Sequence, residues 1–156
     1  MTDKKQIRVY ADTSVFGGVF DEEFDKASQI FFEAVRKGKF LLVTSELVHQ
    51  ELQAGPQKVQ KLFEDILVIA EVTEIVPDVL KLQKSYIDEG IVPENYSTDA
   101  MHVAIATISQ VKMIISWNFK HIVNFQKIPL YNAVNALNGY SEIAIYSPLE
   151  VIEYED

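Results

Sequence analysis

The sequence predicts an α/β fold in which helices flank a central parallel sheet. Short apolar segments of the strand type alternate with helical segments along the chain, and only short connections separate them. No internal repeat, linker or low-complexity run interrupts the 156 residues, so we expect a single domain over residues 1–156. In a sheet of this kind the functional site lies at the carboxyl ends of the strands.

The first half of the chain is expected to contain three strands and three helices. Apolar residues at the helical period predict a helix at Glu22–Lys37, which Gly38 ends. Thr44 or Ser45 is suited to cap a second helix, which runs to about residue 54. The other elements are a loop at 12–18, a helix at 56–66 and strands at 6–11, 40–43 and 68–72.

The second half is expected to contain two strands and four helices. Pro77 is suited to the first turn of a helix, and Gly90 ends that helix. Ser97 or Thr98 is suited to cap the next one, which runs to about Gln110. The other elements are strands at 113–116 and 143–146, a short helix at 119–125 and a helix at 130–138.

Composition excludes several classes of protein. The net charge of −9, from 14 Lys and Arg against 23 Asp and Glu, argues against a surface that coats nucleic acid broadly. RNA is still a workable substrate if the contact face is locally basic or a metal ion offsets the acidic charge. The longest apolar run is five residues, whereas a membrane helix needs about 20, so we expect no membrane partner. The absence of cysteine is compatible with a reducing cytoplasm, where we expect the protein, and leaves oxygen or imidazole ligands for any metal.

Four polar residues fall where this fold has its site. Asp12 ends the first strand, and Glu51 lies in the helix after the second. Asp99 is in the first turn of a later helix, and Asn118 follows the strand at 113–116. Glu51 and Asp99 each share a helix face with apolar residues, so their carboxylates are expected to point inward.

Carboxylates that lie close together need their negative charge to be compensated. The chain has too few cations to pair them all, so they would repel one another unless some become protonated or a divalent cation lies between them. Mg²⁺ and Mn²⁺ prefer oxygen ligands. A metal held by carboxylates suits phosphodiester hydrolysis, because it polarises the phosphoryl oxygen and activates a water molecule.

Four segments also resemble the four motifs of PIN domains, in the same order. They are DTSVFGG (12–18), SELVHQEL (45–52), STDAMHVAIA (97–106) and IISWNFKHIVN (114–124), and the resemblance spans about residues 7–146. It implies a three-layer PIN-like sandwich whose central parallel sheet has about five strands in the order 3-2-1-4-5. It also implies a metal-dependent endoribonuclease using Mg²⁺ or Mn²⁺, often the VapC-type toxin of a pair in which an antitoxin protein inhibits it.

The resemblance assigns roles by motif position. Asp12, Glu51 and Asp99 are expected to be the catalytic, metal-binding carboxylates, and Ser14 is the small hydroxyl residue beside the first of them. Asn118 stands where many members have a fourth acid, and we expect it to be the fourth catalytic, metal-binding residue. This difference removes one negative charge and puts a tightly held second metal in doubt.

Other residues close to these motifs have two interpretations each. Ser14, Lys120 and His121 are candidates for the substrate side of the site, and Lys120 and His121 could contact RNA phosphate. His102 and His121 are single histidines near helical segments, where packing or capping is the commoner role. Trp117 is expected in the core, with base stacking as the alternative.

Simpler structural roles also exist for the acids. Asp12 could be an ordinary turn acid bonded to the backbone that follows it. Asp99 could serve the helix dipole, a role compatible with metal binding. Glu46 competes with Glu51 for the second carboxylate, although it is expected in the exposed first turn of the same helix.

Other functions were weighed against the ribonuclease. A haloacid-dehalogenase-like phosphatase needs D-x-D after the first strand, where this chain has Asp12-Thr13-Ser14. A response-regulator receiver needs an acidic pair where this chain has Val9-Tyr10. The serious alternative is a catalytically weak or inactive PIN-like scaffold that binds a protein or RNA, which Asn118 and the net charge would support.

Apolar residues suggest a homodimer. Four of them cluster after the first strand, namely Val15, Phe16, Val19 and Phe20. Phe31 and Phe32 occupy adjacent helix positions, so one ring is expected to face away from the core and meet a second chain. A groove formed by two chains could then gather Lys58, Lys61 or Lys120 near RNA phosphates.

Overall fold

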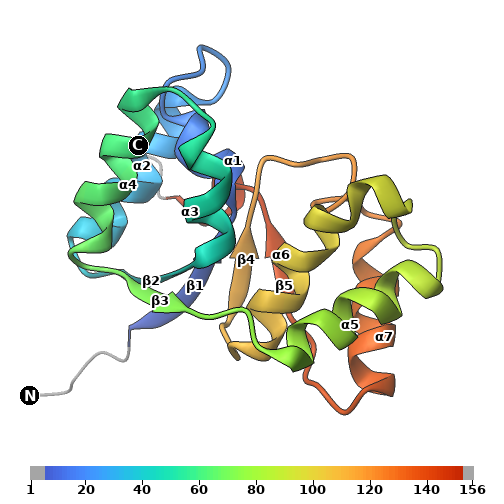
Figure 1. Cartoon of the computed structure of the whole chain (residues 1–156). Coiled ribbons are helices and arrows are strands. Elements are labelled where there is room, and N and C mark those ends of the chain that lie inside the picture. Colours follow the sequence, from blue (N-terminus) through green and yellow to red (C-terminus); the bar gives the residue numbers. More distant parts are fainter. Residues whose placement is uncertain (1–5, 153–156) are drawn as a thin grey trace, which may run out of the picture.

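A five-stranded parallel sheet forms the middle layer of the protein, with helices on both sides (Figure 1). The computed structural model describes residues 6–152. The strand order β3-β2-β1-β4-β5 confirms the order implied by the motifs, and every neighbouring pair is parallel. The strands are β1 (Ile7–Ala11), β2 (Phe40–Ser45), β3 (Glu71–Thr73), β4 (Met113–Ile115) and β5 (Ala144–Tyr146).

The helices divide between the two faces of the sheet. Those that connect β1 to β2 and β2 to β3 lie on one face, and those that connect β3 to β4 and β4 to β5 lie on the other (Figure 1). Within residues 6–152, no helix is both long and apolar enough to cross a bilayer. The helices are α1 (Thr13–Gly18), α2 (Asp25–Arg36), α3 (Glu46–Gln53), α4 (Gln57–Leu67), α5 (Pro77–Asp88), α6 (Ser97–Ile108), α7 (Ile128–Leu137) and α8 (Pro148–Val151), with a 3₁₀ turn η1 (Glu94–Tyr96) before α6.

Strand register brings the ends of β1 and β4 together. Ala11 of β1 lies beside Ile115 of β4, and the backbone N–H of Asp12 continues the ladder to the Ile115 carbonyl at 3.1 Å. The next residue on each strand, Asp12 and Ser116, therefore lies at the same carboxyl edge of the sheet. This edge is where the fold class predicts the functional site.

The segment 12–18 contains helix α1, so the predicted loop is wrong. The Asp12 side chain caps this helix by accepting a hydrogen bond from the Ser14 backbone N–H at 3.1 Å. Val15 and Phe16 are fully buried and hold the helix against the core. Two glycines favoured a loop in the sequence, but tertiary packing outweighs their low helix propensity.

The segment 119–125 forms turns, so the predicted short helix there is also wrong. The Asn118 side chain accepts a hydrogen bond from the His121 backbone N–H at 3.0 Å, and that of Asn124 accepts one from Gln126 at 3.0 Å. Asparagine side chains that bond the backbone in this way compete with helical hydrogen bonds. The backbone beyond Asn118 is therefore fixed by side-chain caps.

One strand boundary and one helix cap also differ from the sequence prediction. The third strand covers 71–73 and not 68–72, because the backbone N–H of Ile69 still bonds to Ile66 at the end of α4, at 3.0 Å. Helix α6 begins at Ser97 as expected. Neither Ser97 nor Thr98 caps it, because η1 leads directly into the helix and Tyr96 occupies the cap position.

Both phenylalanines of the Phe31–Phe32 pair are buried, so the expectation that one ring faces outward is wrong. Their exposed fractions are 0% and 1%. The Phe31 ring stacks on Phe40 and the Phe32 ring contacts Phe16, with centroid distances of 5.7 and 4.9 Å. Helix α2 is covered on more than one side, since it contacts α1, β2 and α8. This pair offers no surface to a second chain.

Candidate active site

Asp12 is the central residue at the carboxyl edge of the sheet. Only 4% of its surface is exposed. Its Oδ1 accepts hydrogen bonds from the backbone N–H and the hydroxyl of Ser14, at 3.1 and 2.5 Å, and its Oδ2 accepts one from the Ser116 hydroxyl at 2.6 Å. The Ser14 hydroxyl in turn accepts a hydrogen bond from the Trp117 backbone N–H at 2.9 Å. The carboxylate is therefore fixed in direction by neutral donors.

The pKa of Asp12 is raised above its ordinary value. Burial is the main cause, and the charge of Glu51 adds to the rise. The charge of His102 and the hydroxyls of Ser116 and Ser14 act in the opposite direction without cancelling it. The charged form of Asp12 is consequently costly in the folded protein unless a cation approaches it.

Glu51 is held beside Asp12 by two donors. It projects from α3, and its Oε1 accepts a hydrogen bond from the Thr13 hydroxyl at 2.8 Å. The Nε2 atom of His102 lies 2.6 Å from the same oxygen and donates to it, because an ionised carboxylate only accepts. Burial alone would raise the pKa of Glu51, but the hydrogen bond and charge of His102, with the Thr13 hydroxyl, lower it. Glu51 is thus an ionised carboxylate in a fixed position.

His102 connects Glu51 to the core. The histidine is 2% exposed, and its Nδ1 lies 2.7 Å from the hydroxyl of Tyr10 in β1. That hydroxyl is 2.9 Å from the hydroxyl of Ser45, which also caps α3 by accepting from the Val48 backbone N–H at 3.3 Å. A continuous chain of hydrogen bonds therefore joins the end of β2 to the Glu51 carboxylate.

Asp99 lies in the first turn of α6, as predicted, but apart from the other two acids. It is half-buried and forms no hydrogen bond or ion pair with another residue in the range 6–152. Its charge acts on His121, whereas it does not contribute to the pKa shifts of Asp12 and Glu51. The structure brings Asp12 and Glu51 together and leaves Asp99 beside His121.

Of the three residues predicted on the substrate side, Ser14 bonds to Asp12, whereas Lys120 and His121 lie near Asn118 in the loop after β4. The Asn118 side-chain oxygen caps the turn at His121, and its backbone N–H donates to the Ser116 hydroxyl at 2.9 Å. Lys120 is exposed, with its ammonium 5.2 Å from the centre of the Tyr96 ring. The His121 ring is buried against the Tyr96 ring, with a centroid distance of 4.2 Å, so a ligand could reach it only if Tyr96 moved.

Two residues important for the carboxylates escaped the sequence analysis. Ser116, which donates to Asp12, is detectable only once β1 and β4 are known to be neighbours in this register. His102 was assigned a packing or capping role, yet it is also the partner of Glu51. A signal for it exists, since His102 follows Asp99 by three positions and therefore shares its side of α6.

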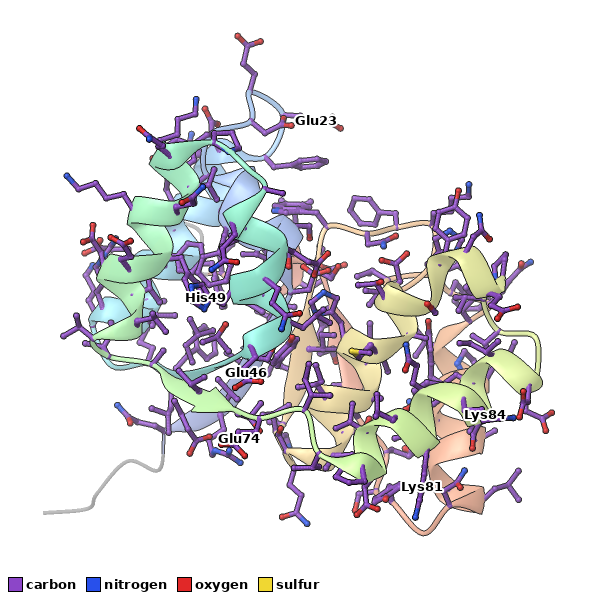
Figure 2. The ribbon with its side chains drawn as sticks, viewed as in Figure 1. Glu23, Glu46, His49, Glu74, Lys81 and Lys84 are labelled. Atoms are coloured by element: carbon purple, nitrogen blue, oxygen red, sulfur yellow. The ribbon has the colours of Figure 1, made fainter. Side chains whose placement is uncertain are left out.

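Glu46 does not belong to the site. It is the exposed first residue of α3, and Figure 2 shows it beside β3 at the start of the helix. Figure 2 also shows the third histidine, His49, between α3 and α4, where its ring stacks on Phe63 with a centroid distance of 5.6 Å. Neither residue contacts Asp12 or Glu51.

The acids fit a divalent cation in chemistry but not in spacing. Asp12, Glu51 and Asp99 supply the oxygen ligands that Mg²⁺ and Mn²⁺ prefer, and no Lys or Arg within residues 6–152 forms an ion pair with any of them. However, nowhere in that range do three or more His, Asp or Glu side chains lie close enough together to hold a metal ion. Binding an ion through three of these side chains would therefore require side-chain movement.

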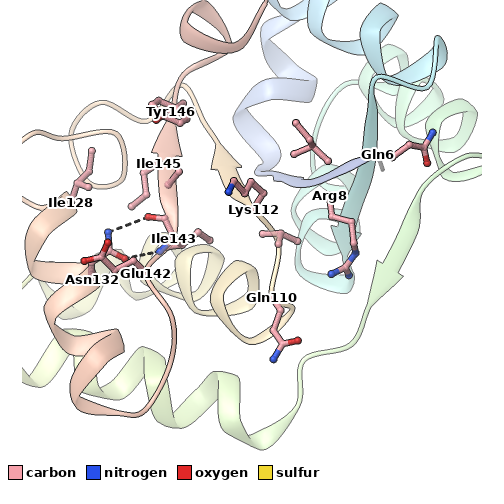
Figure 3. A pocket seen from close by; sticks show the side chains of 13 residues that line it. Gln6, Arg8, Gln110, Lys112, Ile128, Asn132, Glu142, Ile143, Ile145 and Tyr146 are labelled. Atoms are coloured by element: carbon pink, nitrogen blue, oxygen red, sulfur yellow. Dashed lines mark hydrogen bonds between the residues drawn. The ribbon is translucent and has the colours of Figure 1, made fainter. Parts of the chain in front are cut away.

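A hollow of about 1030 Å³ lies at the opposite, amino-terminal edge of the sheet (Figure 3). Its lining includes Arg8, Lys112 and Glu142, but Arg8 is already paired with Glu71 and with the Ser109 carbonyl. Asn132 uses its side chain to bond the backbone of Ile143 at 2.8 and 3.1 Å, as Figure 3 shows. None of the four predicted site residues lines this hollow. Cavity volume by itself would therefore place a binding site away from the carboxylates.

Comparison with known proteins supports the fold. No protein-family model matches the chain, and neither does any curated protein. The fold does match that of solved structures, at 11–12% sequence identity. One is VapBC2 from Rickettsia felis bound to a DNA fragment from its promoter, with 12% identity, a TM-score of 0.58, and coverage of 90% of this chain and 98% of that chain. The second is FitAcB from Neisseria gonorrhoeae, with 11% identity, a TM-score of 0.59, and coverage of 92% of this chain and 99% of that chain. The third is FitAB bound to an IR36 DNA fragment, with 12% identity, a TM-score of 0.59, and coverage of 94% of this chain and 99% of that chain. The shared fold is the PIN-like fold that the four motifs predicted.

Proposed function

We propose that the protein is a metal-dependent endoribonuclease that hydrolyses RNA phosphodiester bonds by means of Asp12, Glu51 and Asp99. Asp12 carries the proposal, because it is a buried carboxylate with a raised pKa and no Lys or Arg partner in the described range. Such a group costs stability, and perturbed acids of this kind concentrate at functional sites. It lies at the carboxyl edge of the sheet, where folds of this class have their sites.

Mg²⁺ or Mn²⁺ is the cofactor in this proposal. When bound, such an ion polarises a phosphoryl oxygen and lowers the pKa of an attacking water. The chain's own residues prepare the ligands, since Ser14 and Ser116 direct the Asp12 carboxylate and His102 directs that of Glu51. Asn118 offers at most a neutral oxygen that already caps a turn, so we expect a second ion to be held weakly.

A partner protein is part of the proposal. The solved structures of similar fold are VapBC and FitAB toxin–antitoxin complexes, and we propose that this chain is likewise the toxin of such a pair. Its antitoxin would cover apolar surface of this chain and restrain cleavage in the cytoplasm. The exposed apolar side chains available for such contact include Phe20, Val68 and Ile69.

The first test is cleavage of a labelled structured RNA by protein from a nuclease-deficient host. We expect cleavage with Mg²⁺ or Mn²⁺, none in EDTA, and a rate at least about a hundredfold lower in Asp99→Asn. The melting temperature of Asp99→Asn should stay level, because this carboxylate has no hydrogen-bond partner to lose in the described range. Asp65→Asn, which changes an exposed acid of α4, is the matched control and should cleave normally. Full activity in Asp99→Asn would reject its role.

A non-enzymatic scaffold is the second candidate, and the satisfied acids favour it. Asp12 has three neutral donors and Glu51 has two donors including His102, so neither carboxylate requires a metal to complete its hydrogen bonds. Thermal unfolding separates the two candidates, since an ion that binds only the folded state must raise its melting temperature. If millimolar Mg²⁺ and Mn²⁺ both leave it unchanged, the scaffold is preferred.

The homodimer stays a prediction, now with a different surface. Phe31 and Phe32 are buried, but Leu80 of α5 and Leu130 and Leu137 of α7 are exposed on two helices that pack against each other. We expect a dimer of about 35 kDa, twice the 17.7 kDa chain, in size-exclusion chromatography with light scattering at micromolar concentration. A single species of 17.7 kDa would contradict it.

A further inference from the structure

Aromatic and basic side chains gather beside Asp99 at the edge of the candidate site. Tyr96 lies directly before α6 and is 38% exposed, and Phe119, in the loop after β4, is 48% exposed. The Lys120 ammonium lies 5.2 Å from the centre of the Tyr96 ring, and the His121 ring lies 4.2 Å from the same centre. The loop after β4 therefore meets the start of α6 through these side chains.

His121 has a hydrogen-bonding capacity that the described residues leave unused. Its side chain is 5% exposed, and neither ring nitrogen has a partner. Its backbone cannot easily move, because its N–H donates to Asn118 at 3.0 Å and its carbonyl accepts from the Tyr131 hydroxyl at 2.7 Å. A buried imidazole without partners is costly, and a polar ligand that reached it would remove that cost. The partly exposed Tyr96 ring packs against it.

Phe119 is backed by a rigid aromatic row. The Phe24 and Trp117 rings stack with a centroid distance of 4.2 Å and an angle of 23°, and Trp117 meets Phe119 edge-on at 6.1 Å. Trp117 is itself fixed, since its indole N–H donates to the Ser28 hydroxyl at 2.8 Å. Phe119 thus combines an ordered inner edge with an exposed outer surface, which suits a planar ligand.

We propose that Tyr96, Phe119, Lys120 and His121 form a binding site for an unpaired RNA nucleotide adjacent to the cleaved phosphate, an inference that rests on the proposed function. The base stacks on the exposed rings of Tyr96 and Phe119, and the Lys120 ammonium contacts a phosphate. When Tyr96 shifts to stack on the base, the His121 ring gains a polar group of the nucleotide as its hydrogen-bond partner. Bases in a duplex are already stacked and paired, so the site selects single-stranded segments.

Charge distinguishes this site from a general nucleic-acid surface. The chain has a net charge of −9, and within this site the Lys120 ammonium lies 5.2 Å from the centre of the Tyr96 ring. Stacking is nearly independent of salt, whereas each lysine–phosphate contact adds about one to the salt slope. Binding should therefore show a shallow salt dependence, and Lys120→Ala should remove about one unit of that slope.

The test is binding of an eight-nucleotide single-stranded RNA containing 2-aminopurine, measured by anisotropy and by quenching in EDTA, where the proposed cleavage is blocked. Tyr96→Ala and Phe119→Ala should each weaken binding by about 5- to 150-fold and reduce the quenching, as loss of one stacked base predicts. Tyr96→Phe keeps the ring and should bind like wild type. Phe125→Ala is the matched control, because Phe125 is 92% exposed in the same region and none of the aromatic ring contacts within residues 6–152 involves it.

Each outcome decides one of the two proposals. Wild-type affinity in both Tyr96→Ala and Phe119→Ala overturns the nucleotide site, as does equal affinity for the duplex form of the RNA or no binding of the single strand. Cleavage by wild type with Mg²⁺ or Mn²⁺ in that case leaves the proposed function standing. If binding depends on stacking but no metal condition gives cleavage, the nucleotide site is supported and the proposed endoribonuclease activity is contradicted.

Discussion

Asp12→Asn is expected to lower the cleavage rate at least about a hundredfold while raising the melting temperature. Activity falls because the variant loses the buried carboxylate on which the proposed function rests. Stability rises because asparagine carries no charge where burial has raised the pKa of Asp12. The amide keeps an oxygen for the Ser14 donors, and the Ser116 hydroxyl can accept from its NH₂ group.

The stability gain should depend on pH. A raised pKa means that folded Asp12 retains its proton to a higher pH than the unfolded chain does, so the wild type loses stability as pH rises from the unfolded value through the folded one. At neutral pH the folded protein carries the whole cost of the charge. The difference in melting temperature between Asp12→Asn and wild type is therefore largest at neutral pH and shrinks on acidification.

Circular dichroism melts at several pH values, with cleavage assays on the same preparations, measure both effects. Asp65→Asn again serves as control, because it removes one exposed aspartate and should change neither quantity. A melting temperature that falls in Asp12→Asn would show that the carboxylate stabilises the fold. Undiminished cleavage would remove Asp12 from the reaction.

The places of the three acids in the fold were predictable from the sequence, but their contacts were not. Asp12 follows an apolar strand, and Glu51 and Asp99 lie on apolar helix faces, so periodicity alone located them. Their partners depend on tertiary structure, since Ser116 meets Asp12 through the β1–β4 register and His102 meets Glu51 across two helices. Glu51 has a partner although the chain has few lysines and arginines, because the partner is a histidine.

The errors in the fold have a common physical cause. Helix α1 contains Gly17 and Gly18, which favour a loop, and segment 119–125 has apolar residues at near-helical spacing, which favours a helix. In the first case burial of neighbouring side chains outweighs propensity, and in the second asparagine side chains cap the backbone. Both outcomes depend on contacts outside the segment. The strand order was predicted correctly, because the resemblance of four motifs to PIN domains implied the topology of the whole sheet.

The two glycines of α1 should respond in opposite ways to alanine. A Cβ on Gly18 would lie 2.6 Å from the Ser28 hydroxyl and 2.7 Å from the Trp117 indole nitrogen, two groups that hydrogen-bond each other in the core. Gly18→Ala should cost about 1–3 kcal/mol, as overpacking typically does. A Cβ on Gly17 would meet no atom within 4 Å, so Gly17→Ala should be neutral or stabilise by up to about 1 kcal/mol.

Trp117 makes this pair of variants informative about the site as well as the fold. It is the only tryptophan, so its fluorescence and near-ultraviolet circular dichroism report directly on the contact with Gly18. Its backbone N–H donates to the Ser14 hydroxyl, which in turn donates to Asp12, so a displaced indole should also disturb the Asp12 carboxylate. We expect Gly18→Ala to shift the tryptophan signal, lower the melting temperature and reduce cleavage together, whereas Gly17→Ala leaves the signal and the cleavage rate unchanged. Equal melting temperatures and identical tryptophan spectra in the two variants would show that the close packing of α1 against Trp117 does not control the site.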